Sequence, residues 1–476
     1  MSRLKRRELL QRGAALSAAA MLGPIGGASA VGIDYDVIII GAGISGMSAA
    51  RMMSKVGPGL KVLVLDARDR VGGRIYTSTD DVSPHGVELG AQFIHGSKAA
   101  TFELVEEYGL QTRSMNHFGE PEYLYFNDGQ QAAPLNEDAR EASYTKLQQA
   151  YAAYEGPDVS LGEFTEKLGL DGPDPDTIST EANSWSAEPD RISMRAAVED
   201  GAQWDEYLDE NFIIFGGYSR LVKKMEAELS GRIRLESVVT DILWGEEFCG
   251  VIYKDRGIES AVTARRVIVT VPVGVLHSGD LKFQPPLPKA KQSALNTIEM
   301  GQAVVVPMLF EKAFWQGVIP SPGGLSRMDG RVHFSVPHDV RPEGNAISGW
   351  FTGSAAQQLS ALGPEAGLQL VLQWLEQASG FTDLQQQLTW HAFKDWQTDP
   401  YSYGSYSITR PGGQGQRAEL AKPVANTLFF AGEATQPAPH YQTVHGAYLS
   451  GLRVVDEVAS SLDLKVGEEG VIIELL

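Results

Sequence analysis

Three glycines, Gly41, Gly43 and Gly46, form a G-x-G-x-x-G pattern that constrains the fold of this 476-residue chain more than any other feature. The apolar run Val37–Ile40 precedes them, and a stretch of small residues typical of a helix follows. In this context the first glycine permits a tight turn, the second lets the backbone approach a pyrophosphate, and the third lets the helix pack closely on the strand. The pattern predicts a strand–turn–helix unit that binds a dinucleotide at the helix N-terminus.

A second apolar run, Lys61–Leu65, ends in the acidic residue Asp66. An acid at this point of such a unit is placed to accept hydrogen bonds from the ribose hydroxyls of an adenosine. With strand, helix, strand and terminal acid in register, dinucleotide binding is favoured over a glycine-rich turn that binds nothing. Taken alone, the glycines suit NAD as well as FAD.

The first thirty residues are typical of an export leader. Lys5–Leu10 is basic and contains twin arginines, Gly13–Leu22 is mildly apolar but too short to span a bilayer, and Ala28–Ala30 matches an A-x-A cleavage site. This order is similar to a twin-arginine (Tat) signal, which the Tat export machinery reads as an address. A plain secretory leader or an uncleaved anchor is the alternative. We expect a periplasmic or secreted protein, exported folded around its cofactor and without stable membrane insertion.

The chain is strongly acidic, with 60 Asp and Glu against 40 Lys and Arg, a formal charge of −20. Such a surface disfavours nucleic acid and anionic lipid as partners and mildly attracts cationic substrates. The single cysteine, Cys249, excludes an internal disulfide and a cysteine-based metal cluster. No metal site is therefore expected.

The length exceeds what one hydrophobic core usually serves, so two domains are expected. Short apolar runs at 233–235, 267–272 and 428–432 are typical of a parallel sheet buried on both faces. Residues 101–199 are rich in helix formers and indicate a helical insertion. Further strands are predicted at 302–310, 332–336 and 346–351, and helices at 363–379 and 444–459.

Four later segments narrow the class of cofactor: 66–74, 88–97, 396–407 and 429–447. Together with the glycine pattern they resemble the flavin-dependent amine oxidase family, which includes monoamine and polyamine oxidases and related histone demethylases. The resemblance runs from about residue 36 to 458, with the motifs in the family's order. It implies an α/β fold in which a Rossmann-like FAD-binding domain is interleaved with an α+β substrate-binding domain, the architecture of amine oxidases and p-hydroxybenzoate hydroxylase.

The interleaving gives a set of expected boundaries. After the leader at 1–30, the FAD-binding domain takes 31–100, 212–290 and 420–462. The substrate-binding domain takes 101–211 and 291–419, and 463–476 forms a C-terminal tail.

The resemblance assigns a long set of residues to a non-covalently bound FAD. Arg68 and Arg74 can act as bidentate donors to phosphate or to the flavin edge. Glu433 resembles an acid near the ribityl chain or pyrophosphate, and Thr443 opens a helix whose amides would face the flavin pyrimidine ring. The full set is Gly41, Gly43, Ile44, Ser45, Gly46, Asp66, Ala67, Arg68, Gly72, Gly73, Arg74, Gly90, Ala91, Gln92, Phe93, Val239, Trp396, Gly432, Glu433, Thr443 and Val444.

Three residues are implied on the substrate side. Trp396 and Tyr403 supply aromatic planes that could align an amine, with cation–π attraction for its protonated form. His95 is suited to proton handling because its ordinary pKa is near neutrality. In some relatives a second aromatic residue faces the amine from the position of Thr443. We therefore expect aromatic side chains on only one side of the amine here. The alternative is that the tyrosines only pack and that the histidine is structural.

One position departs from the family pattern. The family usually carries a lysine that holds a water near the flavin N5 atom, and Val305 stands at that place. Another group holds the water, the alignment is shifted, or reoxidation differs and electrons pass to a carrier. Covalent attachment of the flavin is not expected, because Ser405 stands near the position of the cysteinyl link in some monoamine oxidases.

The implied activity is oxidation of an amine by hydride transfer to flavin N5, with hydrolysis of the imine and peroxide formation where O2 is the acceptor. An L-amino-acid oxidase is one alternative. It needs an arginine for the substrate carboxylate, with Arg191 and Arg195 as candidates. The others are an amine dehydrogenase serving a periplasmic electron carrier and an FAD-binding protein without oxidase activity.

Overall fold

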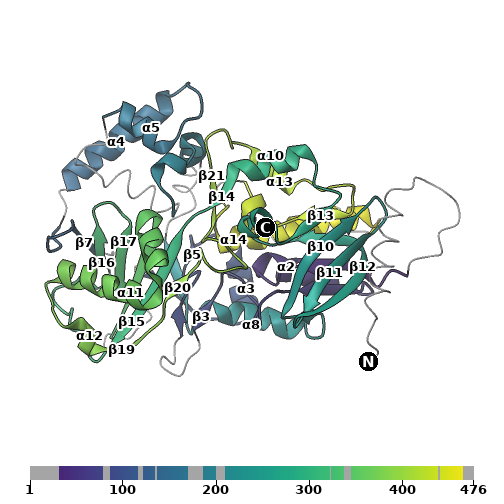
Figure 1. The fold of residues 1–476 in the computed structure, drawn as a ribbon, viewed down its shortest axis with the longest axis horizontal. Coiled ribbons are helices and arrows are strands. Elements are labelled where there is room, and N and C mark those ends of the chain that lie inside the picture. The colour runs from purple at the N-terminus through teal and green to yellow at the C-terminus, as the bar shows by residue number, and fades with distance from the viewer. Residues whose placement is uncertain are drawn as a thin grey trace. The chain divides into compact units, whose positions relative to one another are not determined.

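The computed structural model describes residues 32–78, 86–115, 122–134, 137–169, 186–199, 210–321, 323–336, 345–437 and 440–464. The predicted leader at 1–30 lies outside them, as does most of the predicted tail. The chain divides into two compact units (Figure 1). The first contains the chain up to Gly73, Val222–Asn296 and the chain from Gly415; the second contains Arg74–Leu221 and Thr297–Gln414. The first break precedes the expected one at 100.

The first unit is built on an eight-stranded mixed sheet. Strand β1 pairs in parallel with β12 and β2, and its residues Val37–Ile40 are almost completely buried. The strand order is β13 (Lys282–Gln284), β10 (Ser237–Trp244), β11 (Cys249–Asp255), β12 (Ile258–Val269), β1 (Tyr35–Ile40), β2 (Val62–Leu65) and β9 (Ile233–Arg234), with β22 (Leu428–Phe430) paired to β12. The apolar run predicted at 267–272 is the buried end of β12, whose outer half forms antiparallel pairs with β11.

Two helices of the first unit, α2 (Ile44–Val56) and α14 (Val444–Ser461), pack closely against each other. Small residues make this possible, since a Cβ at Gly451 would lie 2.3 Å from the Ser45 carbonyl oxygen. The Ser45 and Ser450 hydroxyls also hydrogen bond at 3.0 Å. Further helices are α8 (Ser219–Glu228), which begins in the second unit, α9 (Val273–Ser278), α10 (Lys289–Thr297), α13 (Gln416–Ala421) and the 3-10 turn η3 (Glu433–Thr435).

The second unit contains a seven-stranded, mainly antiparallel sheet. One face packs on helix α11 (Gly353–Ser379), with Val304, Val306 and Phe310 in the shared core. Because side chains alternate along a strand, Val305 projects from the opposite face. The order is β19 (Leu388–His391), β15 (Ala303–Phe310), β18 (Ala346–Thr352), β17 (Val332–Val336), β16 (Gly323–Arg327) and β7 (Glu122–Phe126), with β20 (Lys394–Asp395) also paired to β15.

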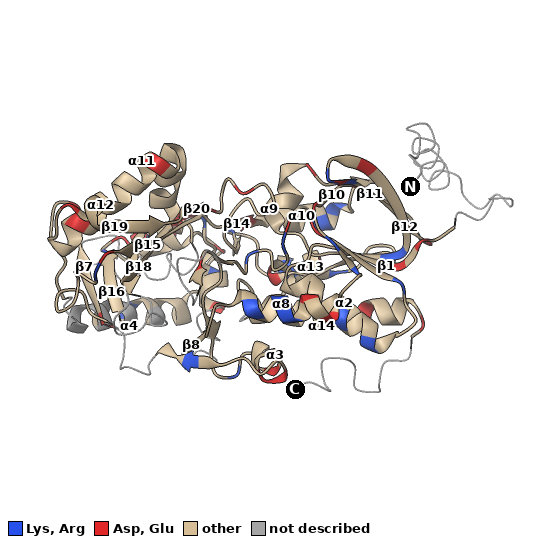
Figure 2. Cartoon of the chain, turned by 90° about the horizontal axis from the view of Figure 1, so that it is seen from below, with Lys and Arg blue, Asp and Glu red and all other residues tan. Residues whose placement is uncertain are grey.

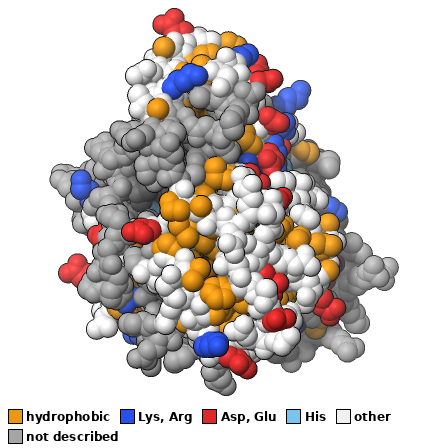
Figure 3. Space-filling model, turned by 90° about the vertical axis from the view of Figure 1, so that its left-hand side faces the viewer, with side chains coloured by type: hydrophobic (Ala, Val, Ile, Leu, Met, Phe, Trp, Pro, Cys, Tyr) orange, Lys and Arg blue, Asp and Glu red, His pale blue; other side chains and the backbone are white. Residues whose placement is uncertain are grey.

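Smaller elements complete the second unit. Two short pairs are β3 (Thr77–Ser78) with β4 (Val87–Glu88) and β14 (Ile298–Met300) with β21 (Ser407–Thr409), and a three-stranded sheet has the order β5 (Ile94–His95), β8 (Asn211–Ile214), β6 (Thr112–Ser114). The helices are α3 (Thr101–Glu107), α4 (Glu137–Ala153), α5 (Leu161–Lys167), η2 (Pro189–Arg191) and α12 (Leu384–Gln387). Figure 3 shows hydrophobic side chains in patches, with charged ones scattered around them, on one face of the molecule.

The predicted α/β fold is confirmed, but one segment was wrong and part of one helix was missed. The segment 101–199 is not wholly helical, because Glu122–Phe126 contains alternating β-forming aromatic residues and joins the large sheet as β7. The helix predicted at 363–379 is confirmed as the second part of α11, and the prediction missed the first part, which begins at Gly353 and is separated from the second by a non-helical kink at Gly363 (φ 75°), just before Pro364.

Acidic and basic residues are spread over the ribbons of both units (Figure 2). Among the described residues, no helix is long and apolar enough to cross a membrane, and no group of His, Cys, Asp and Glu could hold a metal ion. Cys249 is buried and free.

Candidate functional site

The turn between β1 and α2 contains the three glycines of the motif. Only at Gly43 is there open space where a side chain would lie. Gly41 adopts φ +109°, and a Cβ at Gly46 would lie 2.0 Å from the Gly41 carbonyl oxygen. These two glycines are therefore required by the protein's own packing. At Gly43 a Cβ would meet no atom within 4 Å. Packing does not explain a glycine there, whereas close approach of a ligand to the helix N-terminus does.

A second glycine pair lies against this turn. Gly72 donates its N–H to the Ala42 carbonyl at 2.8 Å, and a Cβ at Gly73 would lie 3.5 Å from the Gly43 Cα. The segment after β2 therefore returns to the turn, as the motif predicts.

Asp66 organises the same turn from the end of β2. Its carboxylate accepts the Ala42 N–H at 2.6 Å and the Arg68 N–H at 2.8 Å. Burial raises the pKa of this carboxyl, and the two backbone donors oppose that effect. Each carboxylate oxygen keeps a further lone pair, so the predicted role toward a ribose hydroxyl is compatible with these bonds.

The predicted C-terminal segment belongs to the same unit. Gly432 adopts φ +125° directly after β22 and donates its N–H to the Ser450 hydroxyl at 2.8 Å. Glu433 is buried, and its carboxylate accepts the Gln442 N–H at 3.1 Å. Thr443 caps α14 by accepting the Gly446 N–H at 2.9 Å. Helix α14 begins at Val444, as predicted.

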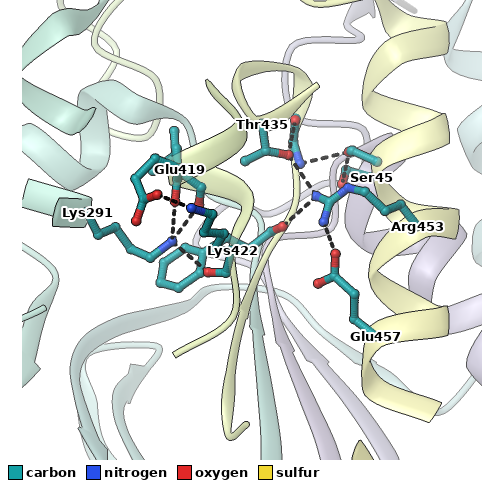
Figure 4. A network of polar contacts seen from close by, with 11 residues as sticks. Ser45, Lys291, Glu419, Lys422, Thr435, Arg453 and Glu457 are labelled. Carbon is teal, nitrogen blue, oxygen red and sulfur yellow. Dashed lines mark hydrogen bonds and ion pairs between the residues drawn. The ribbon is translucent and has the colours of Figure 1, made fainter. Parts of the chain in front are cut away.

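A buried lysine and a half-buried arginine hold the strand and turn that lead to Gly432 (Figure 4). Lys291 donates to the carbonyls of Glu419, Leu420 and Lys422 at 2.7–3.1 Å, and its Nζ lies 4.0 Å from the centroid of the Phe430 ring. Arg453 donates to the Phe430 carbonyl at 2.8 Å and to the Thr435 hydroxyl at 3.1 Å. The segments before and after Gly432 are thus held by contacts within the protein.

We expect replacement of Lys291 by methionine to change how stability depends on pH. Burial lowers the pKa of Lys291 from 10.5 to about 7, so the unfolded chain binds its proton more readily. The contribution of this group to folding is complete above pH 10.5 and is lost as the pH falls through about 7. The difference in unfolding free energy between wild type and Lys291→Met should therefore grow from pH 7 to pH 10 in urea titrations. Lys289→Met, at an exposed neighbour, should show no such trend.

In the second unit, Trp396 joins three predicted segments. Its indole N–H donates to the Leu89 carbonyl at 2.8 Å. A Cβ at Gly90 would lie 3.1 Å from the Trp396 ring and 2.0 Å from the Arg74 carbonyl oxygen. The Arg74 guanidinium in turn donates to the Ser405 carbonyl at 2.9 Å. Residues spread over more than three hundred positions thus form one rigid cluster.

The loop after Trp396 is tightly folded. Tyr403 adopts φ +54° and donates its N–H to the Asp399 carbonyl at 2.8 Å, while the Gly404 N–H donates to the Trp396 carbonyl at 2.8 Å. The Ser405 hydroxyl is buried and, within the part of the chain that the structure describes, has no hydrogen-bond partner. A buried hydroxyl of this kind calls for a partner from outside the chain.

His95 lies opposite Asn211 in the pairing of β5 with β8. Its Nδ1 lies 2.7 Å from the Asn211 Oδ1 atom. An amide oxygen only accepts, so Nδ1 carries the proton and Nε2 is an acceptor. Desolvation lowers the pKa of the imidazole below 6.5. His95 is therefore a neutral, oriented base.

Sequence reasoning missed the residues that share the face of Val305. Strand pairing places Trp350 and Lys394 on either side of Val305, and His333 beyond Trp350. Burial lowers the pKa of His333 to about 4, and its ring packs on Tyr123 with centroids 5.1 Å apart. The alternation of side chains along 302–310 and 346–351 could have indicated which residues of each strand lie on the face of Val305. It could not show which residues of different strands are neighbours there.

The predicted residues fall into two groups, one in each unit. Val239 lies beside a β-bulge in β10, the second strand of the eight-stranded sheet that also contains β1. The first unit holds Gly41, Gly43, Ile44, Ser45, Gly46, Asp66, Ala67, Arg68, Gly72, Gly73, Val239, Gly432, Glu433, Thr443 and Val444, and the second holds Arg74, Gly90, Ala91, Gln92, Phe93, His95, Trp396 and Tyr403.

Comparison with known proteins gives concordant results. A family model described as flavin containing amine oxidoreductase matches residues 44–459. The chain is 30% identical to lysine-specific histone demethylase 1 homolog 2 of Arabidopsis thaliana, over 90% of this chain and 59% of that protein. It is 29% identical to polyamine oxidase 4 of Oryza sativa subsp. japonica, over 90% of each. A solved putrescine oxidase variant from a redesign of cofactor binding shares the fold, with a TM-score of 0.76, 22% identity, and coverage of 90% of this chain and 99% of that one.

Proposed function

Because this chain belongs to the flavin containing amine oxidoreductase family, we propose that it oxidises a polyamine or another primary or secondary amine with a non-covalently bound FAD. The chain spans only 59% of the demethylase relative but 90% of the polyamine oxidase, which favours a small amine over a protein substrate. The observation that carries the proposal is Trp396, an aromatic plane fixed by its indole N–H in a cluster with Arg74 and Gly90.

The residues present fit a flavin. Gly43 leaves space at the helix N-terminus where a side chain would obstruct a pyrophosphate, and the buried Ser405 hydroxyl lacks a partner among the described residues. The Asp66 carboxylate would hold a ribose hydroxyl of the adenosine half. When bound, the flavin supplies the acceptor for the hydride that leaves the α-carbon of the amine.

The chain's own part is to bind, orient and deprotonate the amine. Amines are protonated near neutral pH, and an ammonium carbon cannot release a hydride. The acidic surface and the Trp396 ring attract the cation. His95, neutral and oriented by Asn211, accepts the ammonium proton at Nε2. The imine product then leaves and is hydrolysed by water to an aldehyde or ketone and an amine or ammonia.

Oxygen is the acceptor that we favour, with a periplasmic electron carrier as the alternative. The proposed location is the periplasm or the exterior, reached through a Tat-type leader at 1–30.

The L-amino-acid oxidase alternative is weaker. Arg191 already pairs with Glu299 at 2.5 Å. Arg195 donates to the Gly156 carbonyl and lies over the Tyr154 ring, 5.7 Å from its centroid. Both candidate arginines therefore serve the protein's own structure.

Anaerobic mixing tests the proposal. The FAD-loaded protein would be mixed with polyamines, primary and secondary monoamines, a methyl-lysine peptide and L-amino acids, and the loss of flavin absorbance followed. Rapid bleaching by a polyamine or simple amine is expected, followed by recovery and peroxide on admission of O2. Bleaching by amino acids alone, or by no compound in the panel, would refute the proposal. Bleaching without recovery in O2 would point to a dehydrogenase.

A further inference from the structure

The parallel strands of the first unit end at one edge of its sheet. Strand β1 pairs in parallel with β2 and β12, and β12 pairs in parallel with β22. The residues that follow these strands are therefore neighbours. Around Thr270, which follows β12, a Cβ at Gly41 would lie 2.6 Å from the threonine Oγ1 atom, and a Cβ at Gly432 would lie 3.9 Å from the threonine carbonyl oxygen. Ligands of open α/β sheets bind at this edge.

The Ser450 hydroxyl of helix α14 connects two segments of this edge. Ser450 is completely buried. Its Oγ atom lies 3.0 Å from the Ser45 Oγ atom in the first turn of α2, accepts the Gly432 N–H at 2.8 Å, and donates to the Ala447 carbonyl at 2.7 Å. Thr435 donates its hydroxyl to the Gly432 carbonyl at 2.9 Å, so both backbone polar groups of Gly432 are held. Figure 4 shows Ser45 and Thr435 in this network.

The partners of Ser450 fix the direction of its hydrogen bond with Ser45. A carbonyl only accepts and a backbone N–H only donates, so the single Ser450 proton goes to Ala447 and a lone pair goes to Gly432. The remaining contact then requires the Ser45 hydroxyl as the donor. Because Ser45 has one hydroxyl proton, its oxygen offers only lone pairs to any other group. In this arrangement the Ser45 side chain cannot donate a hydrogen bond to a phosphate.

The start of α2 has backbone donors instead. Its N-cap residue, Gly43, makes no side-chain cap hydrogen bond, whereas Thr443 caps α14. The N–H groups in the first turn of a helix have no partner within the helix, and they favour an anion. The Ser45 side chain thus joins α2 to α14, and the donors to a pyrophosphate come from the backbone of the turn.

We propose that Ser450 is a positioning residue of the dinucleotide site, and that the Ser45 hydroxyl bonds to Ser450 and not to the pyrophosphate. Through its two bonds Ser450 keeps the turn at Gly432 in a fixed position relative to the start of α2. The inference rests on the proposed function, because it takes FAD as the ligand at this edge. Ser450 itself is buried and acts only through the two segments that it joins.

Two other roles make different predictions. If Ser45 donated to the pyrophosphate, its removal would delete a hydrogen bond to a charged group and lower the FAD affinity about 10-fold or more. If Ser450 only packed α14 on α2, its removal would lower the unfolding midpoint of the apoprotein, but saturating FAD would raise that midpoint as much as in wild type. The FAD affinity and the rise in midpoint with FAD therefore separate the three roles.

The experiment titrates the apoprotein with FAD and follows flavin fluorescence, without any amine. Ser450→Ala should lower the FAD affinity about 3- to 10-fold, the scale of one hydrogen bond, because the Gly432 turn loses its connection to α2. Ser45→Ala should lower it no more than Ser450→Ala does, and combining the two should cause no further loss. Ser54→Ala, which removes a hydroxyl bonded to the Ala50 carbonyl at 2.8 Å near the other end of α2, should bind FAD like wild type.

FAD affinity within about twofold of wild type in a folded Ser450→Ala protein would overturn the proposal. A larger loss in Ser45→Ala than in Ser450→Ala, or a further loss in the double variant, would do the same. Ser450→Cys keeps a side chain of similar size that hydrogen bonds only weakly, so it should also lower the affinity, and it replaces the alanine variant if that one folds poorly. Failure of the proposed function is seen separately in the wild type, as absent FAD binding or as bound FAD that no amine reduces.

Discussion

Replacing Gly43 by valine should lower the affinity of the apoprotein for FAD about 100-fold and leave its fold intact, since overpacking by a side chain costs ~2–3 kcal/mol and each 1.4 kcal/mol is tenfold. The backbone there, φ −70° and ψ 173°, is open to any residue, and a Cβ meets no protein atom within 4 Å. The protein therefore leaves room for a β-carbon at this position, and the expected obstruction is the ligand. Fluorescence titration of the apoprotein with FAD measures the loss.

Two further substitutions serve as controls for this result. Gly59→Val also places its Cβ in open space, in a turn outside the motif, and should bind FAD like wild type. Gly46→Val should instead lower the unfolding midpoint of the apoprotein, because its Cβ would lie 2.0 Å from the Gly41 carbonyl oxygen. Normal FAD affinity in a folded Gly43→Val protein would show that the pyrophosphate does not approach this turn.

The contrast between these glycines shows which features could be predicted from the sequence and which could not. Local features were readable: the β1–turn–α2 unit, the acid after β2, and the start of α14 at Val444 depend on neighbours within a few residues. Which glycine serves packing and which leaves room for a ligand depends on atoms such as the Gly41 carbonyl and the Thr270 side chain. Thr270 directly follows β12, far along the chain, and no spacing rule identifies it.

The register of strand pairing is the second feature that could not be predicted from the sequence. The pairing of Val305 with Lys394 and the bond from Trp396 to the Leu89 carbonyl join segments whose separation carries no periodic signal. The sequence indicated that a lysine was missing at 305, but only the sheet shows which side chain lies opposite. The helical reading of 101–199 failed for a different reason, because it passed over the local strand signal of alternating aromatic residues at Glu122–Phe126, which pair with β16 as β7.

Replacing His95 by alanine should lower kcat/KM for the best amine about 100-fold, the scale of a lost general base. In the wild type the acid limb of kcat/KM against pH should lie below pH 6.5, because burial lowers the pKa of this imidazole, and it should vanish in the variant. Asn211→Ala should move the limb further below pH 6.5, because the Asn211 hydrogen bond raises the pKa of His95, and it should reduce the rate less, since the base remains but its ring is no longer oriented. Steady-state kinetics from pH 5 to 9 measure both effects.

Stability provides an independent check of the same residue. A base whose pKa is lowered in the folded state contributes stability that is complete above its unfolded pKa of 6.5 and is lost as the pH falls through the folded value. Wild type should therefore lose stability below pH 6.5 more steeply than His95→Ala. His391→Ala, at an exposed histidine of β19, should leave kcat/KM unchanged. A His95→Ala protein with unchanged kcat/KM and only the altered acid stability would make His95 structural, and the amine would then require another base.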